Sequence, residues 1–211
     1  MWAVAGVVAV ALLGAACTSD ADRGKAEVEA ATLRIEDLPP GWVASPPDTA
    51  VENEGDASRF AQCVGRPEPK TVRTATEVSP QFHVEERSRA SSTVQTVRNL
   101  DIVRDDFAAL DGDRAVGCLR QRLRAQLDRQ STPGSAPRDV TVARLPGLAA
   151  GEGTVSFRAT ITYPTSTAYL DLVNVRMGKL EMSVAFFNQG EPFSADVERS
   201  VLTRMVDRAG K

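Results

Sequence analysis

The chain has 211 residues, of which 42% are apolar and 25% are charged, and its net charge is −3. This length suits one domain with a hydrophobic core, and the composition is too apolar for a disordered chain. Three cysteines and one histidine leave little material for a transition-metal site, so we expect no metal or other cofactor.

The N-terminal residues 1–16 carry no charge and predict a lipoprotein signal peptide. Their apolar core is about ten residues long, which suits a signal peptide and is too short to span a bilayer. Small residues lead directly into Cys17, and a polar stretch follows. This arrangement resembles a bacterial lipobox, whose cysteine receives acyl chains such as palmitate and becomes the mature N-terminus. A plain secretory signal and an uncleaved membrane anchor are the alternatives.

Residues 17–32 are small and charged without apolar periodicity, which predicts a flexible tether ahead of a domain over 33–211. Each buried methylene of a lipid contributes about 0.8 kcal/mol, so two or more acyl chains hold a protein firmly on a bilayer. We therefore expect the domain on the outer, extracytoplasmic face of the cell membrane, with that membrane as a partner.

Cys63 and Cys118 form an even pair in a compartment that export makes oxidising, which predicts a disulfide. The bond closes a loop of about 55 residues and adds at most roughly 4 kcal/mol in the chain-entropy estimate. A pair of buried free thiols is the alternative. A catalytic thiol is disfavoured, because His83 is the single imidazole that could activate one.

The first part of the domain predicts short elements. Trp42 follows a Pro-Pro-Gly turn that directs its side chain into the core, and residues 56–64 form a short helix with Asp56 as its N-cap. The segment 71–98 is rich in Val, Thr and Ser and predicts two or three strands with a break at 79–80.

Two helices follow as an αα-hairpin, because apolar residues recur there at helical spacing. Asn99 or Asp101 caps the first helix and Gly112 ends it, and Asp113 caps the second. Cys118 points away from the apolar seam of the second helix, so the disulfide would pin the short helix 56–64 onto its back.

The last part predicts a strand over 139–145 and then an antiparallel three-strand meander. Apolar and polar residues alternate over 155–163, as is typical of strands. The Gly-Lys dipeptide at 178–179 fits a two-residue type II′ turn, which sets Met177 opposite Leu180.

The same register places Arg176 opposite Glu181 on the other face, as an ion pair across the strands. A three-residue hairpin loop sets Ile161 opposite Tyr169 on the core face. A final helix over 194–209 has a wide apolar stripe, which predicts that it lies flat on the sheet.

No motif for catalysis or phosphate binding stands out. His83 has no partners at the spacing of a zinc, calcium or hydrolase motif and is interpreted as an exposed strand residue. The glycines of 147–153 lack the following helix of a phosphate loop. The arginines of 114–129 scatter around their helix, which indicates a solvated face and no nucleic-acid site. We therefore expect no enzymatic activity.

The second face of the meander is apolar at one end and polar at the other. A second layer of helices covers it in the favoured interpretation, and in the alternative it remains an open groove. Such a groove, with an apolar floor and a polar rim, suits an amphiphile or a peptide. The candidate ligand-binding residues are Leu170, Leu172, Arg176 and Phe187.

Several motifs together suggest a family: LPPGW at 38–42, SPQF at 79–82, SSTVQTVRN at 91–99, and a cysteine in each of two helices. The pattern resembles the actinobacterial envelope lipoproteins related to the extracellular sensor domain of PknH-type serine/threonine kinases, over roughly 33–209. The resemblance implies an α+β domain, with an antiparallel sheet flanked by helices, a stabilising disulfide and a cleft suspected of binding a ligand. The kinase-linked domains carry two disulfides where this chain can make one.

Two functions follow as hypotheses. The first is a membrane-anchored, noncatalytic envelope lipoprotein whose sensor-like domain binds a small or amphiphilic envelope ligand. The second is a structural or protein-interaction module of the envelope that binds no small molecule. A hydrolase is disfavoured for want of a motif.

Overall fold

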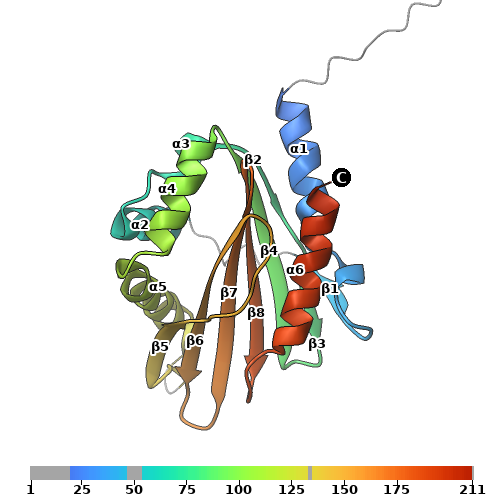
Figure 1. The fold of residues 1–211 in the computed structure, drawn as a ribbon. Coiled ribbons are helices and arrows are strands. Elements are labelled where there is room, and N and C mark those ends of the chain that lie inside the picture. Colours follow the sequence, from blue (N-terminus) through green and yellow to red (C-terminus); the bar gives the residue numbers. More distant parts are fainter. Residues whose placement is uncertain (1–19, 47–53, 133–134, 211) are drawn as a thin grey trace, which may run out of the picture.

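An eight-stranded antiparallel sheet lies between two layers of helices (Figure 1). The structure is a computed structural model and describes residues 20–46, 54–132 and 135–210. The strands lie in the order β1-β3-β4-β8-β7-β6-β5, and β2 also pairs with β4. The expected α+β class is confirmed. The strands are β1 (Val43–Ser45), β2 (Arg73–Val78), β3 (Gln81–Val84), β4 (Ser88–Val97), β5 (Asp139–Arg144), β6 (Gly153–Thr162), β7 (Thr167–Met177) and β8 (Leu180–Gln189).

The helices cover the two faces of the sheet in separate groups. On one face lie α1 and α6, and on the other lie α2, α4 and α5 (Figure 1). The helical elements are α1 (Asp20–Ala31), the 3-10 turn η1 (Ile35–Asp37), α2 (Glu54–Val64), α3 (Pro69–Val72), α4 (Leu100–Leu110), α5 (Arg114–Gln130) and α6 (Ala195–Ala209).

Most predicted elements are present near their expected bounds. The segment 71–98 forms three strands, and β2 and β3 pair with successive parts of β4 on either side of the break at 79–80. Asn99 caps α4, since its Oδ1 accepts a hydrogen bond from the Ile102 N–H at 3.0 Å. The short helix α2 begins at Glu54, so Asp56 lies inside the helix and not at its N-cap.

The hairpin between β7 and β8 has the predicted register. Met177 pairs with Leu180, and Gly178 has a φ of 53°, which glycine adopts without strain. The predicted register of the preceding hairpin is wrong, because Ile161 pairs with Ala168 and not with Tyr169. The Tyr163 N–H donates to the Ser166 carbonyl at 2.8 Å, which leaves a loop of two residues where three were expected.

That difference of one residue exchanges the faces of β6 relative to β7, because side chains alternate along a strand. Phe157 and Ile161 therefore lie on the face of Leu172, with α4 and α5. Val173 lies on the other face, with α6. The sheet thus has an apolar core on each side.

Trp42 enters the core on the α6 side as predicted, where its ring lies 6.0 Å from that of Phe193. The same core receives Val201, Leu202 and Met205 of α6, so this helix does lie on the sheet.

The predicted disulfide between Cys63 and Cys118 is present, with their Cα atoms 5.8 Å apart. It joins the last turn of α2 to α5, so the alternative of two free thiols is excluded. The bond fixes two helices of the same layer to each other.

The flexible tether expected over 17–32 is wrong from Asp20 onward. Residues 20–31 form α1, and Val28 and Ala31 are fully buried in the core beside α6. The apolar residues of this segment are few and small. They pack closely in the core, but they do not form the apolar stripe by which a helix is recognised in a sequence. Residues 17–19, like the signal peptide, lie outside the described part of the chain.

Arg208 of α6 fixes the end of α1 to the domain. Its guanidinium donates to the Ala30 and Thr32 carbonyls and makes two hydrogen bonds with the Asp37 carboxylate, at 2.7 and 2.8 Å. The Asp37 side chain is 2% exposed, so this is a buried, bidentate ion pair that also satisfies the carbonyls at the end of a helix.

Replacing Arg208 by Ala leaves the Asp37 carboxylate buried without its partner. We expect Arg208→Ala to lower the free energy of unfolding by about 3–5 kcal/mol in urea denaturation. The matched control is Arg199→Ala, which removes an exposed ion pair with Asp196 on the same helix and should change stability by less than about 1 kcal/mol. Equal losses in the two variants would contradict a structural role for the Arg208 contacts.

Candidate functional site

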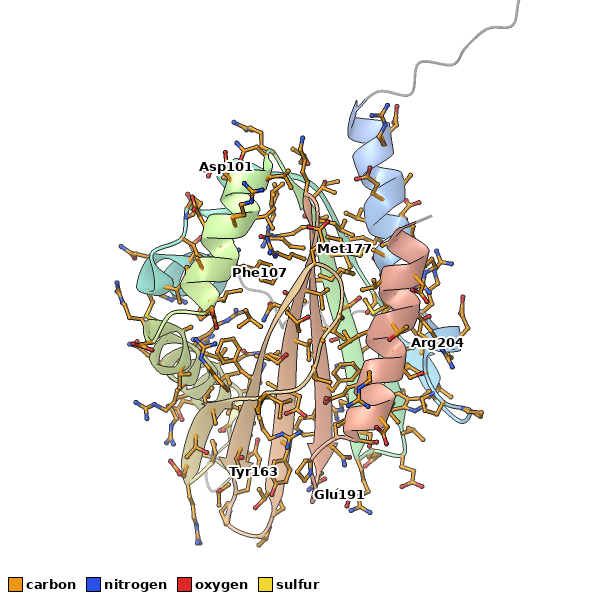
Figure 2. All side chains as sticks on the ribbon, viewed as in Figure 1. Asp101, Phe107, Tyr163, Met177, Glu191 and Arg204 are labelled. Carbon is orange, nitrogen blue, oxygen red and sulfur yellow. A yellow bond between two sulfur atoms is a disulfide. The ribbon has the colours of Figure 1, made fainter. Side chains whose placement is uncertain are left out.

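The helix layer of α2, α4 and α5 covers the second face of the sheet only in part. Its apolar residues pack on β6, where Phe157 is 1% exposed. Phe107 of α4 lies on the side of that helix facing the sheet (Figure 2). Over the middle strands the same face carries polar side chains, and Ser183 of β8 is exposed. This face is therefore covered by helices over β6 and more open over the middle strands.

A hollow of about 200 Å³ lies between the helix layer and the middle strands. Cavities of about 150 Å³ hold benzene, so this hollow has room for a ring-sized group. Its roof is apolar and comes from three helices: Ala57, Phe60 and Ala61 of α2, Phe107 and Leu110 of α4, and Leu119 of α5. Its floor is largely uncharged and polar: Ser91, Thr93 and Gln95 of β4, Asn174 of β7 and Ser183 of β8, with Leu172 and Ala185 beside them.

The pairing of the middle strands produces this polar floor. Thr93 lies opposite Ser183, and Gln95 lies opposite Glu181, in the β4–β8 ladder. Asn174 lies opposite Ser183 in the β7–β8 ladder and accepts a hydrogen bond from its hydroxyl at 2.8 Å. Hydroxyl and amide groups of this kind both donate and accept hydrogen bonds, so the floor can bind polar groups of either kind.

A charged cluster lies at one end of the hollow. Arg66 donates to Asp106 of α4, and its Nη2 lies 3.6 Å from Glu181 Oε2. The Gln95 amide also donates to Glu181. Side-chain exposure is 3% for Asp106 and 8% for Glu181, so both carboxyl groups are shielded from water. The cluster ties the loop after α2 to both α4 and the sheet.

Burial raises the pKa of Glu181 to about 7. The Arg66 charge opposes this shift, and the Asp106 carboxylate reinforces it. Oxygen atoms of both carboxyl groups, Asp106 Oδ1 and Glu181 Oε1, are buried without another partner. Protonation of Glu181 lowers the negative charge beside Arg66.

The predicted ion pair between Arg176 and Glu181 is absent. The two residues are paired across the strands as expected, but Glu181 reaches under the helix layer to Arg66. Arg176 lies over Gly153, where a side chain would collide with it, and its Nη2 donates to the Glu152 carbonyl at 3.3 Å.

Arg73, the first residue of β2, also lines the hollow. It pairs with Val97 of β4 and so lies on the same face as Gln95. Its Nε is buried without a hydrogen-bond partner, and no ion pair of Arg73 with another described residue is present. This guanidinium therefore differs from that of Arg66, which has two carboxyl neighbours.

The four candidate ligand residues of the sequence lie in different places. Leu172 lines the hollow, whereas Leu170 and Phe187 are half-buried and pack against the core beneath the helix layer. The Arg89 guanidinium lies 5.9 Å from the centre of the Phe187 ring. Arg176 is outside the lining.

Sequence reasoning missed Arg66, Arg73 and Gln95 as residues of the hollow. The one local signal was the alternation of small polar residues along 91–95, which marks a strand with a polar face. The polar face of this strand forms part of a site only because β4 pairs with β8. Strands so distant in the chain cannot be paired from the sequence pattern alone.

His83 lies on β3, half-buried, and pairs with Val43 and Arg89 in the sheet. Across residues 20–46, 54–132 and 135–210, no group of His, Cys, Asp and Glu side chains has the arrangement of a metal site. No helix within these ranges is long and apolar enough to span a membrane.

The other face of the sheet holds a second pair of carboxyl groups. Asp171 of β7 is fully buried and accepts two hydrogen bonds from Arg158 of β6, at 2.7 and 2.6 Å. Glu198 of α6 is fully buried beside it. Burial, followed by the hydrogen bond and charge of Asp171, raises the pKa of Glu198 to about 9. Glu198 is therefore protonated at neutral pH, in the core between α6 and the sheet.

Comparisons with known proteins give a structural likeness to a solved extracellular domain. No family model matches the chain, and no curated protein matches it. The extracellular domain of PknH from Mycobacterium tuberculosis is similar in structure, with a TM-score of 0.48 and 10% sequence identity. The match covers 88% of this chain and 96% of that chain.

The buried carboxyl groups predict a stability that falls as pH rises. Glu198 has a folded-state pKa of about 9 against a usual value of 4.5, so the folded chain binds more protons than the unfolded chain between these values. We expect the midpoint of thermal unfolding to fall from pH 5 to pH 9, and Glu198→Gln to flatten this dependence.

The matched control is Glu191→Gln, an exposed carboxyl change that should leave the pH dependence as it is. Glu181→Gln should flatten only the part below about pH 7. A wild-type midpoint that rises from pH 5 to pH 9 would contradict the raised pKa values of Glu181 and Glu198.

Proposed function

We propose that this chain is an exported, lipid-anchored, noncatalytic module that binds a small or amphiphilic ligand in the hollow under α2, α4 and α5. The observation that carries this proposal is the combination of an apolar roof with a hydrogen-bonding floor in one hollow. Binding sites for small molecules are typically concave, mostly apolar and equipped with a few placed polar groups.

The chemistry of the hollow supports binding over catalysis. Its carboxyl group Glu181 is engaged by Arg66 and Gln95, and the described lining contains no histidine, cysteine or lysine. Among the serines of the lining, Ser183 donates its hydroxyl hydrogen to the Asn174 amide oxygen and not to a base, unlike the activated nucleophile of covalent catalysis.

The sequence around Cys17 supports the lipid anchor, and the disulfide suits an oxidising compartment outside the cytoplasm. The first helix begins three positions after Cys17. Three residues span about 10 Å at most, so an acylated Cys17 would hold the domain close to the membrane surface.

A structural or protein-interaction module is the second candidate. The observation that favours it is the exposure of Val43 on the edge strand β1. This residue is 50% exposed. Edge strands with exposed apolar residues are suited to pairing with another chain. A protein of this kind would carry no small molecule in its hollow.

Blocking the hollow tests the first candidate against the second. Ser183 is exposed on the floor, so Ser183→Trp should fill the hollow and leave the fold intact. We expect native mass spectrometry of the chain purified from its own envelope to show a bound small molecule that Ser183→Trp lacks. The control Thr141→Trp, at an exposed position of β5, should retain it. A wild-type chain without bound mass, or equal occupancy in both variants, would contradict the proposal.

The anchor has a separate test. We expect Cys17→Ala to abolish labelling by radioactive palmitate and to release the protein into the medium or leave it unprocessed. Cys63→Ala with Cys118→Ala keeps Cys17 and should retain the label. Unchanged labelling of Cys17→Ala would contradict lipidation at this residue.

A further inference from the structure

The lining of the hollow has an excess of positive charge. Its charged side chains are Arg66, Arg73, Arg122 and Glu181. Arg66 is neutralised by Asp106 and Glu181, and Arg122 lies with its guanidinium 5.5 Å from the centre of the Phe60 ring. Arg73 makes no ion pair with another described residue. Within the described part of the chain, the positive charge of Arg73 is therefore not offset by an ion pair.

A guanidinium without an ion-pair partner in a partly enclosed hollow favours a ligand with negative charge. The Arg73 side chain is half-buried, and its Nε–H lies away from water without an acceptor. A buried donor without an acceptor destabilises the fold. A carboxylate satisfies such a donor well, because its two oxygens match the fork of guanidinium N–H groups.

The surroundings of Arg73 agree with an acidic group and disagree with a cation. Further along β4, four and six residues from the Val97 position that pairs with Arg73, the floor has the hydroxyl groups of Thr93 and Ser91, which can donate to other polar groups of a ligand. A cationic group would meet the charge of Arg73, which no ion pair with a described residue offsets.

The rest of the hollow fits an apolar body. Phe60, Phe107 and Leu119 form its roof, and Phe157 and Leu172 extend the apolar surface to the sheet. A volume of about 200 Å³ suits one ring or a short chain.

We propose that the hollow takes an anionic amphiphile, whose carboxylate or similar acidic head binds Arg73 and whose ring-sized apolar part lies under α2, α4 and α5. This inference rests on the proposed ligand-binding function and adds the charge and orientation of the ligand. A free organic acid and the acidic head of a membrane lipid share this chemistry.

The test compares two probes of equal body and different head, 4-phenylbutyrate and 4-phenylbutan-1-ol. Binding is measured by isothermal titration calorimetry with the full chain carrying Cys17→Ser, so that no detergent competes with the probes. The protein with no substitution in the hollow should bind the acid at least about tenfold more tightly than the alcohol, as expected for a hydrogen bond between charged groups.

Arg73→Gln removes the charge without removing any ion pair or hydrogen bond of the described chain, so it should fold. We expect it to weaken binding of the acid about tenfold and to leave binding of the alcohol unchanged. The control Arg104→Gln, at an exposed position of α4, should affect neither probe.

The outcomes separate this inference from the function on which it rests. If both probes bind equally and Arg73→Gln changes neither, the anionic head is overturned and the hollow remains a binding site. If neither probe binds and native mass spectrometry shows no occupant, the ligand-binding function itself fails.

Sedimentation with vesicles of phosphatidylglycerol or of phosphatidylcholine then identifies the source of the acidic head. Loss of phosphatidylglycerol binding in Arg73→Gln supports a lipid head. Binding of 4-phenylbutyrate without any vesicle binding supports a free acid.

Discussion

The row of polar side chains along the middle strands determines how the helices can cover the second face of the sheet. Thr93, Gln95, Asn174 and Ser183 share this face through the pairing of β4, β8 and β7. Helices with apolar faces gain free energy by packing on apolar strands, and here those strands are β5 and β6. The helix layer therefore packs at one side of the sheet and leaves a hollow over the other. The disulfide from α2 to α5 keeps this layer together, and Arg66 ties it to the floor.

The opposite face shows what the same sheet does without a polar row. There α1 and α6 pack closely on Val173, Val184 and Phe186, all of which are buried. On that side the buried Asp171 carboxylate is paired with Arg158, and the buried Glu198 carries a raised pKa. One face thus provides stability and the other provides the site. This division explains how a domain of modest size keeps a hollow without losing its fold.

Local features of the sequence predicted local structure correctly. The glycine turn at 178–179, the Asn99 cap and the two cysteines each act through neighbours in the chain or through simple pairing rules. The errors came from features that depend on the rest of the fold. A hairpin loop shorter by one residue reversed the face of β6, and burial against α6 converted an expected tether into a helix. The site needed the pairing of β4 with β8, which brings Gln95 to Glu181 across a long stretch of chain. Leu172 alone of the predicted ligand residues reached the hollow.

If the polar row serves binding, it is retained at the expense of stability, and removing it should stabilise the fold. The most direct measurement is the free energy of unfolding of the double variant Asn174→Leu with Ser183→Val, by urea denaturation. The two side chains bond each other, so replacing both leaves neither without that partner, and the long bond of 3.3 Å from Asn174 Nδ2 to the Val155 carbonyl is lost as well. We predict a rise of about 1 kcal/mol, because apolar side chains can then pack under the helix layer. A fall of that size would show that the polar row holds the fold together, and would contradict its assignment to a ligand.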